Sequence, residues 1–483
     1  MNKLLINLID DKSTKRKLQI LEILSSAEGI LTSHDLAKQL NCSSRTITNE
    51  IGELRVKAPE NWNIKSVKTK GYVLQKPTTE SLSSILMSYV QESIIYKILL
   101  ETFNSNYYSL EKWSQILYMN KSSLRDNLKQ FNNSILNANS LEFKVGLVKL
   151  NGDEINIRYF YKALFFNIEK CAYMIELPDD LMKKIQDLIK NYNVEIDYLL
   201  LKVVIYVSIY RITSKNFVKK PVGFDIIFLK EQLTCFNEII SEIEDYCMIK
   251  LPQEEKDTLR LFFFLISYCK NQQKNEILKF YKENNEGYFE RFLGLIDILV
   301  SNTGGGDIEY DHLKRELGAS VYKLNIAKEN NLPIEYFITK HQFLSYRLQK
   351  LYNECYHITS KWNKEVNGKR YNEHEISKLA QQATNILSAT FPKRKVLFLF
   401  SGDKTYEGLA CTMLEEKFGD SVEIYRNLDQ GMRYDLIITN YKKPYPNETP
   451  VIFIYQQLNQ KDIENINDLL FNKEIVNNST ITI

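Results

Sequence analysis

The sequence predicts a multidomain, mainly α-helical fold that ends in a small α/β unit. Three patterns predict it. Near the N-terminus, short helical segments followed by an alternating stretch occur twice. From about residue 158 to 387, apolar side chains recur at helical spacing. After residue 391, continuous apolar runs alternate with helical segments, as in a parallel sheet covered by helices. The 483 residues are enough for about three to five domains.

Residues 31–73 have the pattern of a helix-turn-helix followed by a β-hairpin, which together form a winged helix-turn-helix. A polar turn separates two helices of apolar spacing, and Ser43 or Ser44 can cap the second helix. The alternating stretch that follows predicts a hairpin, in which Gly71 can take the positive φ of a turn or bulge. Residues 15–26 supply the first helix of the bundle.

Polar and basic side chains in this module indicate DNA binding. Short hydrogen-bonding side chains and an arginine near the start of a recognition helix can reach base edges, and lysines on a wing can reach phosphates. The residues expected to contact DNA here are Ser44, Arg45, Thr46, Thr48, Asn49, Lys65, Lys68 and Lys70. A small helical bundle whose hairpin makes only protein contacts is the alternative.

A second unit repeats this pattern at an offset of 77 residues, where residues 35–40 match residues 112–117. A helix over residues 88–103 would open the unit, residues 122–136 would form its recognition helix, and residues 141–150 its wing. Such a repeat indicates a duplicated supersecondary unit.

The charge distribution supports a nucleic-acid-binding N-terminal end. Residues 1–150 hold 20 Lys and Arg against 14 Asp and Glu, whereas the remainder holds 43 against 46. In the second unit the expected DNA contacts are Lys121, Ser122, Arg125 and Lys129. Asp126 on the same helix opposes phosphate, so a repeat that keeps the fold without touching DNA is the alternative there.

Cysteine usage and hydropathy favour a cytoplasmic protein without a zinc site or a membrane span. The 7 cysteines are scattered and form no CxxC pair, which indicates free thiols in a reducing compartment. The most apolar segment, residues 198–212, carries Lys202 and Arg211. The N-terminal apolar run is too short for a signal peptide. No cofactor is expected.

The central region divides near Asn271 into two helical bundles, with a loop at residues 304–306. In the α/β unit, the first strand covers residues 395–400 and the closing helix residues 461–471. Ligand sites on parallel sheets lie at the carboxyl ends of the strands, which here is the loop that follows Phe400.

This order of units resembles the Mga/AtxA family of virulence regulators of Gram-positive bacteria, over nearly the whole chain. The resemblance implies a winged helix-turn-helix DNA-binding domain at 1–76 and a second, Mga-type winged helix at 77–157. It further implies helical domains similar to phosphotransferase-system regulation domains (PRDs) at 158–271 and 272–390, and an α/β domain similar to the EIIB component of sugar permeases at 391–483.

The same resemblance implies a homodimeric transcription regulator whose activity follows carbohydrate transport, with activation and repression both open. In that family, PRD histidines can accept phosphate from HPr or a related carrier. In this chain no histidine lies between His34 and His312, so the first bundle lacks an acceptor. In the second bundle, which also holds His341 and His357, His374 just before the last helix is the best match, followed by His312. An ordinary surface histidine is the alternative for each.

The EIIB-like unit departs from an active phosphotransferase at its nucleophile. An EIIB domain carries its phosphorylated cysteine at the end of the first strand, where this chain has Ser401. A serine is not the low-pKa thiolate that the transfer requires, and Cys411 in the following helix is expected to be core. We therefore expect no enzyme activity, and a role in dimerisation through the strand ends and the first helix.

Three functions follow in order of preference. The first is a dimeric regulator of AT-rich, bent promoter DNA that is read partly through its deformability. The second is an antiterminator-like PRD protein that binds RNA, although the small β-structured domain this would need is not evident. The third is a phosphotransfer component, which Ser401 opposes.

Overall fold

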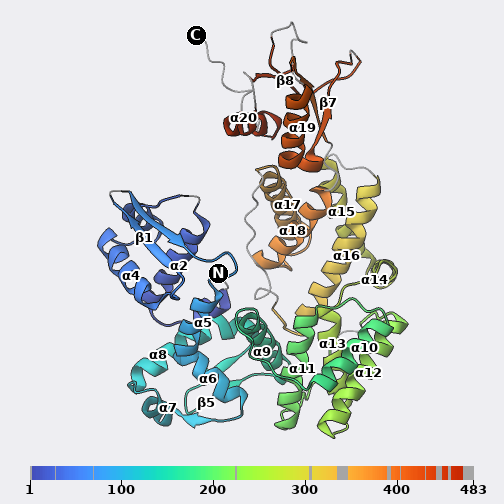
Figure 1. The fold of residues 1–483 in the computed structure, drawn as a ribbon. Coiled ribbons are helices and arrows are strands. Elements are labelled where there is room, and N and C mark those ends of the chain that lie inside the picture. Colours follow the sequence, from blue (N-terminus) through green and yellow to red (C-terminus); the bar gives the residue numbers. More distant parts are fainter. Residues whose placement is uncertain are drawn as a thin grey trace. The chain divides into compact units, whose positions relative to one another are not determined.

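The computed structural model describes residues 3–27, 29–68, 70–223, 226–303, 307–333, 346–388, 393–402, 404–429, 431–441, 449–454 and 458–471. These residues form a mostly helical chain with three small sheets (Figure 1). The chain divides into two compact units, Met1–Ile277 with Tyr322–Thr339, and Leu278–Val321 with Lys340–Ile483. The prediction of a multidomain, mainly α-helical protein is confirmed.

The first winged helix lies in the N-terminal part of the first unit (Figure 1, blue). Its elements are α1 (Lys3–Leu8), α2 (Lys12–Ser26), α3 (Ser33–Gln39), α4 (Ser44–Lys57), β1 (Asn63–Val67) and β2 (Gly71–Gln75). Strands β1 and β2 pair in antiparallel fashion as the expected hairpin. Of the two candidate caps of the second helix, Ser43 is the one used, because its side chain accepts from the Thr46 N–H at 3.1 Å.

The second winged helix contains α5 (Ser83–Glu92), α6 (Ile94–Phe103), β3 (Tyr108–Ser109), α7 (Leu110–Ile116), α8 (Lys121–Phe131), β4 (Glu142–Lys144) and β5 (Leu147–Asn151). The π-helix η1 (Asn132–Leu136) and the 3₁₀ turn η2 (Asn137–Asn139) follow α8. The strands form a sheet of order β3-β5-β4.

The prediction of a single helix over residues 88–103 is wrong, because the helix is interrupted at Ser93. This residue has an extended backbone and caps α6 by accepting from the Tyr96 N–H. Its hydroxyl also donates to the carbonyl oxygen of Leu8 at 2.6 Å. Leu8 ends α1, whose leucines are fully buried in the same core as α5 and α6.

The duplication at an offset of 77 residues is confirmed element by element. Helices α3 and α7 begin and end at matching positions, and α4 and α8 begin at matching positions. The N-caps also correspond, as do the left-handed residues that follow the first helix of each pair. These matched pairs are Thr32 with Ser109, Ser43 with Asn120, and Asn41 with Tyr118.

Helices continue from residue 154 to residue 388, as expected. They are α9 (Glu154–Glu169), α10 (Asp179–Asn191), α11 (Tyr198–Thr213), α12 (Lys230–Cys247), α13 (Gln253–Ile266), α14 (Asn271–Asn284), α15 (Glu286–Thr303), α16 (Asp307–Glu329), α17 (Tyr346–Glu365) and α18 (Glu373–Ser388). A buried ion pair joins Arg158 of α9 to Glu255 of α13. The loop predicted at 304–306 lies outside the described residues. None of the described helices is both long and apolar enough to cross a bilayer.

The C-terminal unit holds the expected parallel sheet. Its elements are β6 (Arg394–Leu399), α19 (Lys404–Phe418), the 3₁₀ turn η4 (Gly419–Ser421), β7 (Val422–Tyr425), β8 (Leu436–Thr439), β9 (Val451–Phe453) and α20 (Gln460–Phe471). The described strands run parallel in the order β7-β6-β8-β9. Residues of α19 and α20 pack with Val396 and Phe398 on one face of β6, while Leu397 faces the other side.

Candidate nucleic-acid interface

The predicted recognition helix α4 buries one face and exposes the other. Ile47, Ile51 and Leu54 lie in the core, whereas Arg45, Thr48 and Asn49 are exposed. Ser44 and Thr46 are half-buried. The side chains predicted to face DNA are therefore on the solvent side of the helix, with Ser44 and Thr46 only partly accessible.

Local hydrogen bonds separate the polar residues of α4 into two groups. The Thr46 hydroxyl lies 2.8 Å from the Ser43 hydroxyl, and the Thr48 hydroxyl donates to the Ser44 carbonyl at 3.0 Å. In contrast, the side chains of Arg45 and Asn49 form no hydrogen bond or ion pair with any described residue. Arg45 and Asn49 are thus the side chains most available for base or phosphate contacts.

Arg55 fixes the wing against α4, a role that the sequence analysis missed. Its guanidinium donates to the Ile64 carbonyl at 2.8 Å and to the Ser66 hydroxyl at 2.6 Å, and it lies 5.9 Å from the centre of the Tyr72 ring. The wing lysines Lys65, Lys68 and Lys70 are all exposed. The signal available in the sequence was a basic residue in the last turn of the recognition helix, just before the wing.

Gly71 allows the wing to return to the start of α3. It has a φ of +129°, in agreement with the expected positive φ, and an added Cβ would lie 2.2 Å from the Leu31 carbonyl oxygen. Leu31 and Tyr72 exchange backbone hydrogen bonds of 3.0 and 2.8 Å. Any larger residue would push these two segments apart.

A buried carboxylate holds α4 to α2. Glu50 accepts from the Arg16 guanidinium at 2.5 to 3.0 Å and from the Ser13 hydroxyl at 2.9 Å. The hydrogen bonds with Glu50 raise the pKa of Arg16. Arg16 therefore supports the recognition helix from behind and does not add to the charge facing DNA.

The second winged helix has a less basic face than the first. Lys121 donates to Glu111 at 2.7 Å, a bond that lowers the pKa of that carboxyl, and the Ser122 hydroxyl donates to the Asn120 side chain at 2.8 Å. Arg125 and Lys129 are exposed and pair with no other described residue. Two of the four predicted contacts are thus already engaged within the module.

The candidate phosphoacceptor histidines lie on different helices of the second unit. His312 on α16 is exposed, with its Nε2 3.7 Å from a Glu316 carboxylate oxygen. His374 is half-buried and is the second residue of α18, so the prediction that it lies just before this helix is wrong, whereas the predicted start at Glu373 is confirmed. Asn372 caps the helix, accepting from the Glu375 N–H at 3.0 Å. His341 lies outside the described residues.

Ser401 follows β6 at the carboxyl end of the sheet, as predicted. Its N–H donates to the Asn440 side chain at 2.8 Å, and the Asn440 amide donates back to the Ser401 carbonyl at 2.7 Å, which ties this loop to the end of β8. Cys411 in α19 is only 1% exposed, and burial raises the pKa of its thiol. The prediction that Cys411 is core is confirmed, so neither residue presents a thiolate in this loop.

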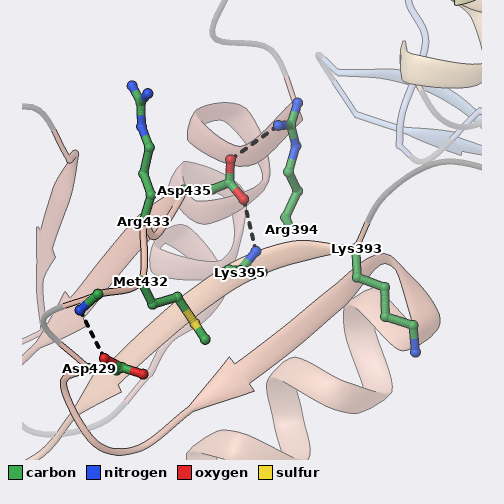
Figure 2. Close-up of a pocket in the computed structure, with 8 residues that line it drawn as sticks. Lys393, Arg394, Lys395, Asp429, Met432, Arg433 and Asp435 are labelled. Carbon is green, nitrogen blue, oxygen red and sulfur yellow. Dashed lines mark hydrogen bonds and ion pairs between the residues drawn. The ribbon is translucent and has the colours of Figure 1, made fainter. Parts of the chain in front are cut away.

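A basic hollow of about 590 Å³ lies at the opposite, amino end of β6 (Figure 2). Figure 2 shows Asp435 between the side chains of Arg394 and Arg433. The Asp435 carboxylate accepts from the Arg394 guanidinium at 3.2 Å and from the Lys395 N–H at 2.9 Å. Parallel sheets bind ligands at their carboxyl ends, so the hollow is not where this topology predicts a site. Among the described residues no group of His, Cys, Asp and Glu side chains could hold a metal ion.

Comparison with known proteins matches both N-terminal modules to DNA-binding families. Residues 16–73 match an HTH domain, and residues 78–165 match the Mga helix-turn-helix domain. The chain is 23% identical to the capsule synthesis positive regulator AcpB of Bacillus anthracis, over 94% of this chain and 98% of that protein.

Two further relatives also align over most of the chain. The anthrax toxin expression trans-acting positive regulator of Bacillus anthracis is 22% identical, over 95% of this chain and 98% of its own length. The probable licABCH operon regulator of Bacillus subtilis (strain 168) is 24% identical, over 94% of this chain and 76% of its own length. Both helix-turn-helix domains and these full-length relatives make the chain similar to the Mga/AtxA-like virulence regulators.

Proposed function

We propose that this protein activates transcription by binding promoter DNA through α4 and the wing of its first winged helix. The observation that carries the proposal is the exposed start of α4, where Arg45 and Asn49 have no partner among the described residues. Arg55 holds the lysine-bearing wing beside that helix. Bases would be read from α4, while Lys65, Lys68 and Lys70 contact phosphates. Relatives that are positive regulators support activation.

The second winged helix would make the weaker contact with DNA. Lys121 and Ser122 are engaged locally, which leaves Arg125 and Lys129 to approach phosphates. With so few free arginines across both modules, specificity would come partly from the deformability of AT-rich, bent DNA.

A homodimer would form through the C-terminal α/β domain, similar in its parallel sheet to an EIIB unit. Tyr406, Leu409 and Met413 follow each other at spacings of three and four on α19, and all three are exposed. A stripe of apolar side chains at this spacing suits pairing with the same helix of a second copy about a two-fold axis.

Phosphorylation of the second helical bundle would regulate the protein, with His374 preferred over His312. Both histidines have glutamate neighbours that oppose an added negative charge, Glu373 and Glu375 for His374 and Glu316 for His312. His374 lies in the first turn of α18, where the helix dipole favours that charge, whereas His312 lies further inside α16. HPr or a related carrier would be the phosphate donor. No observation favours the RNA-binding alternative, and Ser401 opposes the phosphotransfer one.

The test is a salt series of binding to a labelled AT-rich promoter duplex. We expect the variant Arg45→Ala/Lys68→Ala/Lys70→Ala to bind more weakly than the wild-type protein, with a shallower dependence of log Kd on log salt. The variant Lys183→Ala/Lys190→Ala/Lys219→Ala removes three exposed cations from the helical region and controls for net charge. Equal binding by both variants would show that the first winged helix is not the DNA contact.

A further inference from the structure

Resting on the proposed function, we propose that Tyr118 is a neutral DNA contact of the second winged helix. Its ring would lie on a deoxyribose and its hydroxyl would donate to a phosphate oxygen. Tyr118 is the left-handed residue in the turn between α7 and α8, two positions before the cap of the second recognition helix.

The position of Tyr118 is unfavourable for a tyrosine in the protein alone. Its φ is +51°, and the turn is closed by the Met119 N–H, which donates to the Ser114 carbonyl at 3.0 Å. Glycine or asparagine ordinarily fills such a position, and the first module has Asn41 there with a φ of +50°. The side chain is 98% exposed and forms no hydrogen bond, ion pair or ring contact with another described residue, so little packing within the described chain offsets this strain.

The location of Tyr118 would place its exposed ring beside the sugar–phosphate backbone of bound DNA. In a helix-turn-helix, the start of the recognition helix enters the major groove, so the preceding turn lies near the backbone of the duplex. In the first module this end of the helix carries Arg45, a cation without a partner among the described residues. In the second module the corresponding end has Lys121 held by Glu111 and Ser122 held by Asn120. At the start of α8 the second module therefore presents the neutral side chain of Tyr118 to DNA.

The chemistry of a phenol fits the sugar–phosphate backbone. The ring supplies an apolar surface and the hydroxyl supplies one donor, a combination suited to a boundary between apolar and polar groups. Because the side chain is uncharged, the contact releases no counterion. Losing it should weaken binding without changing the slope of log Kd against log salt.

The experiment compares full-length variants on the labelled AT-rich duplex. Tyr118→Asn introduces the residue of the first module, and Tyr118→Phe removes only the hydroxyl. We expect Tyr118→Phe to raise Kd roughly 2- to 10-fold, as for one lost hydrogen bond, and Tyr118→Asn to raise it further. Both should keep the wild-type salt slope, whereas Arg125→Ala should lower that slope by about one unit. Tyr118→Asn should also melt at or above the wild-type temperature.

The matched control is Met248→Asn, at the left-handed residue that ends α12. Met248 has a φ of +53° and is 90% exposed, so it undergoes the same relief of strain away from both winged helices. Its Kd should be unchanged. Wild-type affinity in both Tyr118 variants, or a lower salt slope in either, overturns the inference while leaving the proposed function intact. No binding by the wild-type protein overturns both.

Discussion

Replacing Gly71 by alanine should detach the first wing from the helix-turn-helix. The added Cβ would lie 2.2 Å from the Leu31 carbonyl oxygen and 2.6 Å from its carbon, and both are backbone atoms that cannot rotate away. The segment at Leu31 and strand β2 must therefore separate. The two backbone hydrogen bonds between Leu31 and Tyr72 would then be lost.

The size of the effect follows from these contacts. Two lost hydrogen bonds contribute about 1 kcal/mol each. An alanine at a φ of +129° adds strain of about 1–3 kcal/mol. The loss of about 3–5 kcal/mol is a large part of the roughly 5–15 kcal/mol that stabilises a typical domain. The first winged helix should therefore open locally, and DNA binding should weaken with it.

Hydrogen exchange followed by mass spectrometry measures this local opening. Peptides from residues 12–75 should lose protection in Gly71→Ala, while peptides from the C-terminal sheet keep theirs. Gly52→Ala is the matched control, since its new Cβ on α4 meets no atom within 4 Å and should stabilise that helix by about 0.5–1 kcal/mol. Wild-type protection in Gly71→Ala would refute the reasoning.

Four other perturbations test the remaining parts of the chain. Burial raises the pKa of Asp10 from 3.8 to about 6, so ionisation of this carboxyl destabilises the fold as pH rises from about 4 to 6. Asp10→Asn should therefore raise the free energy of unfolding by about 2 kcal/mol at pH 7 and much less near pH 4, which urea titration at both pH values measures. Glu255→Leu leaves Arg158 buried without this partner and should cost about 3–5 kcal/mol in chemical denaturation, with partial recovery in Arg158→Met/Glu255→Leu. Leu409→Glu should shift the sedimentation coefficient to that of a monomer if α19 forms the dimer. Phosphate transferred from HPr should label wild-type protein and not His374→Ala, and labelling of both would exclude His374 as the acceptor.

Local sequence patterns were sufficient where local interactions decide the structure. The 77-residue offset located α7 and the start of α8, because caps such as Ser43 and Asn120 act within their own turn. The break at Ser93 was missed because apolar spacing continues across it. Besides its local cap, Ser93 is held by a bond to the Leu8 carbonyl, 85 residues away in the chain, which apolar spacing does not reveal.

The candidate site shows the same division between local and distant causes. The exposed face of α4 followed from its periodicity, so Arg45 and Asn49 could be placed in advance. The pairing of Lys121 with Glu111 depends on how two helices cross, which spacing alone does not give. The anchoring of the wing by Arg55 likewise required knowing where the hairpin lies.

The burial of α1 sets an order of events during synthesis. Leu4, Leu5 and Leu8 are synthesised before α5, α6 and α9, the helices against which α1 packs. Until α9 is complete at Glu169, the core into which these leucines pack is incomplete, so part of their apolar surface stays exposed. The first winged helix, although synthesised before the second, is therefore fully anchored only after α9 is complete, and a ribosome pause before residue 169 would leave α1 without its full packing.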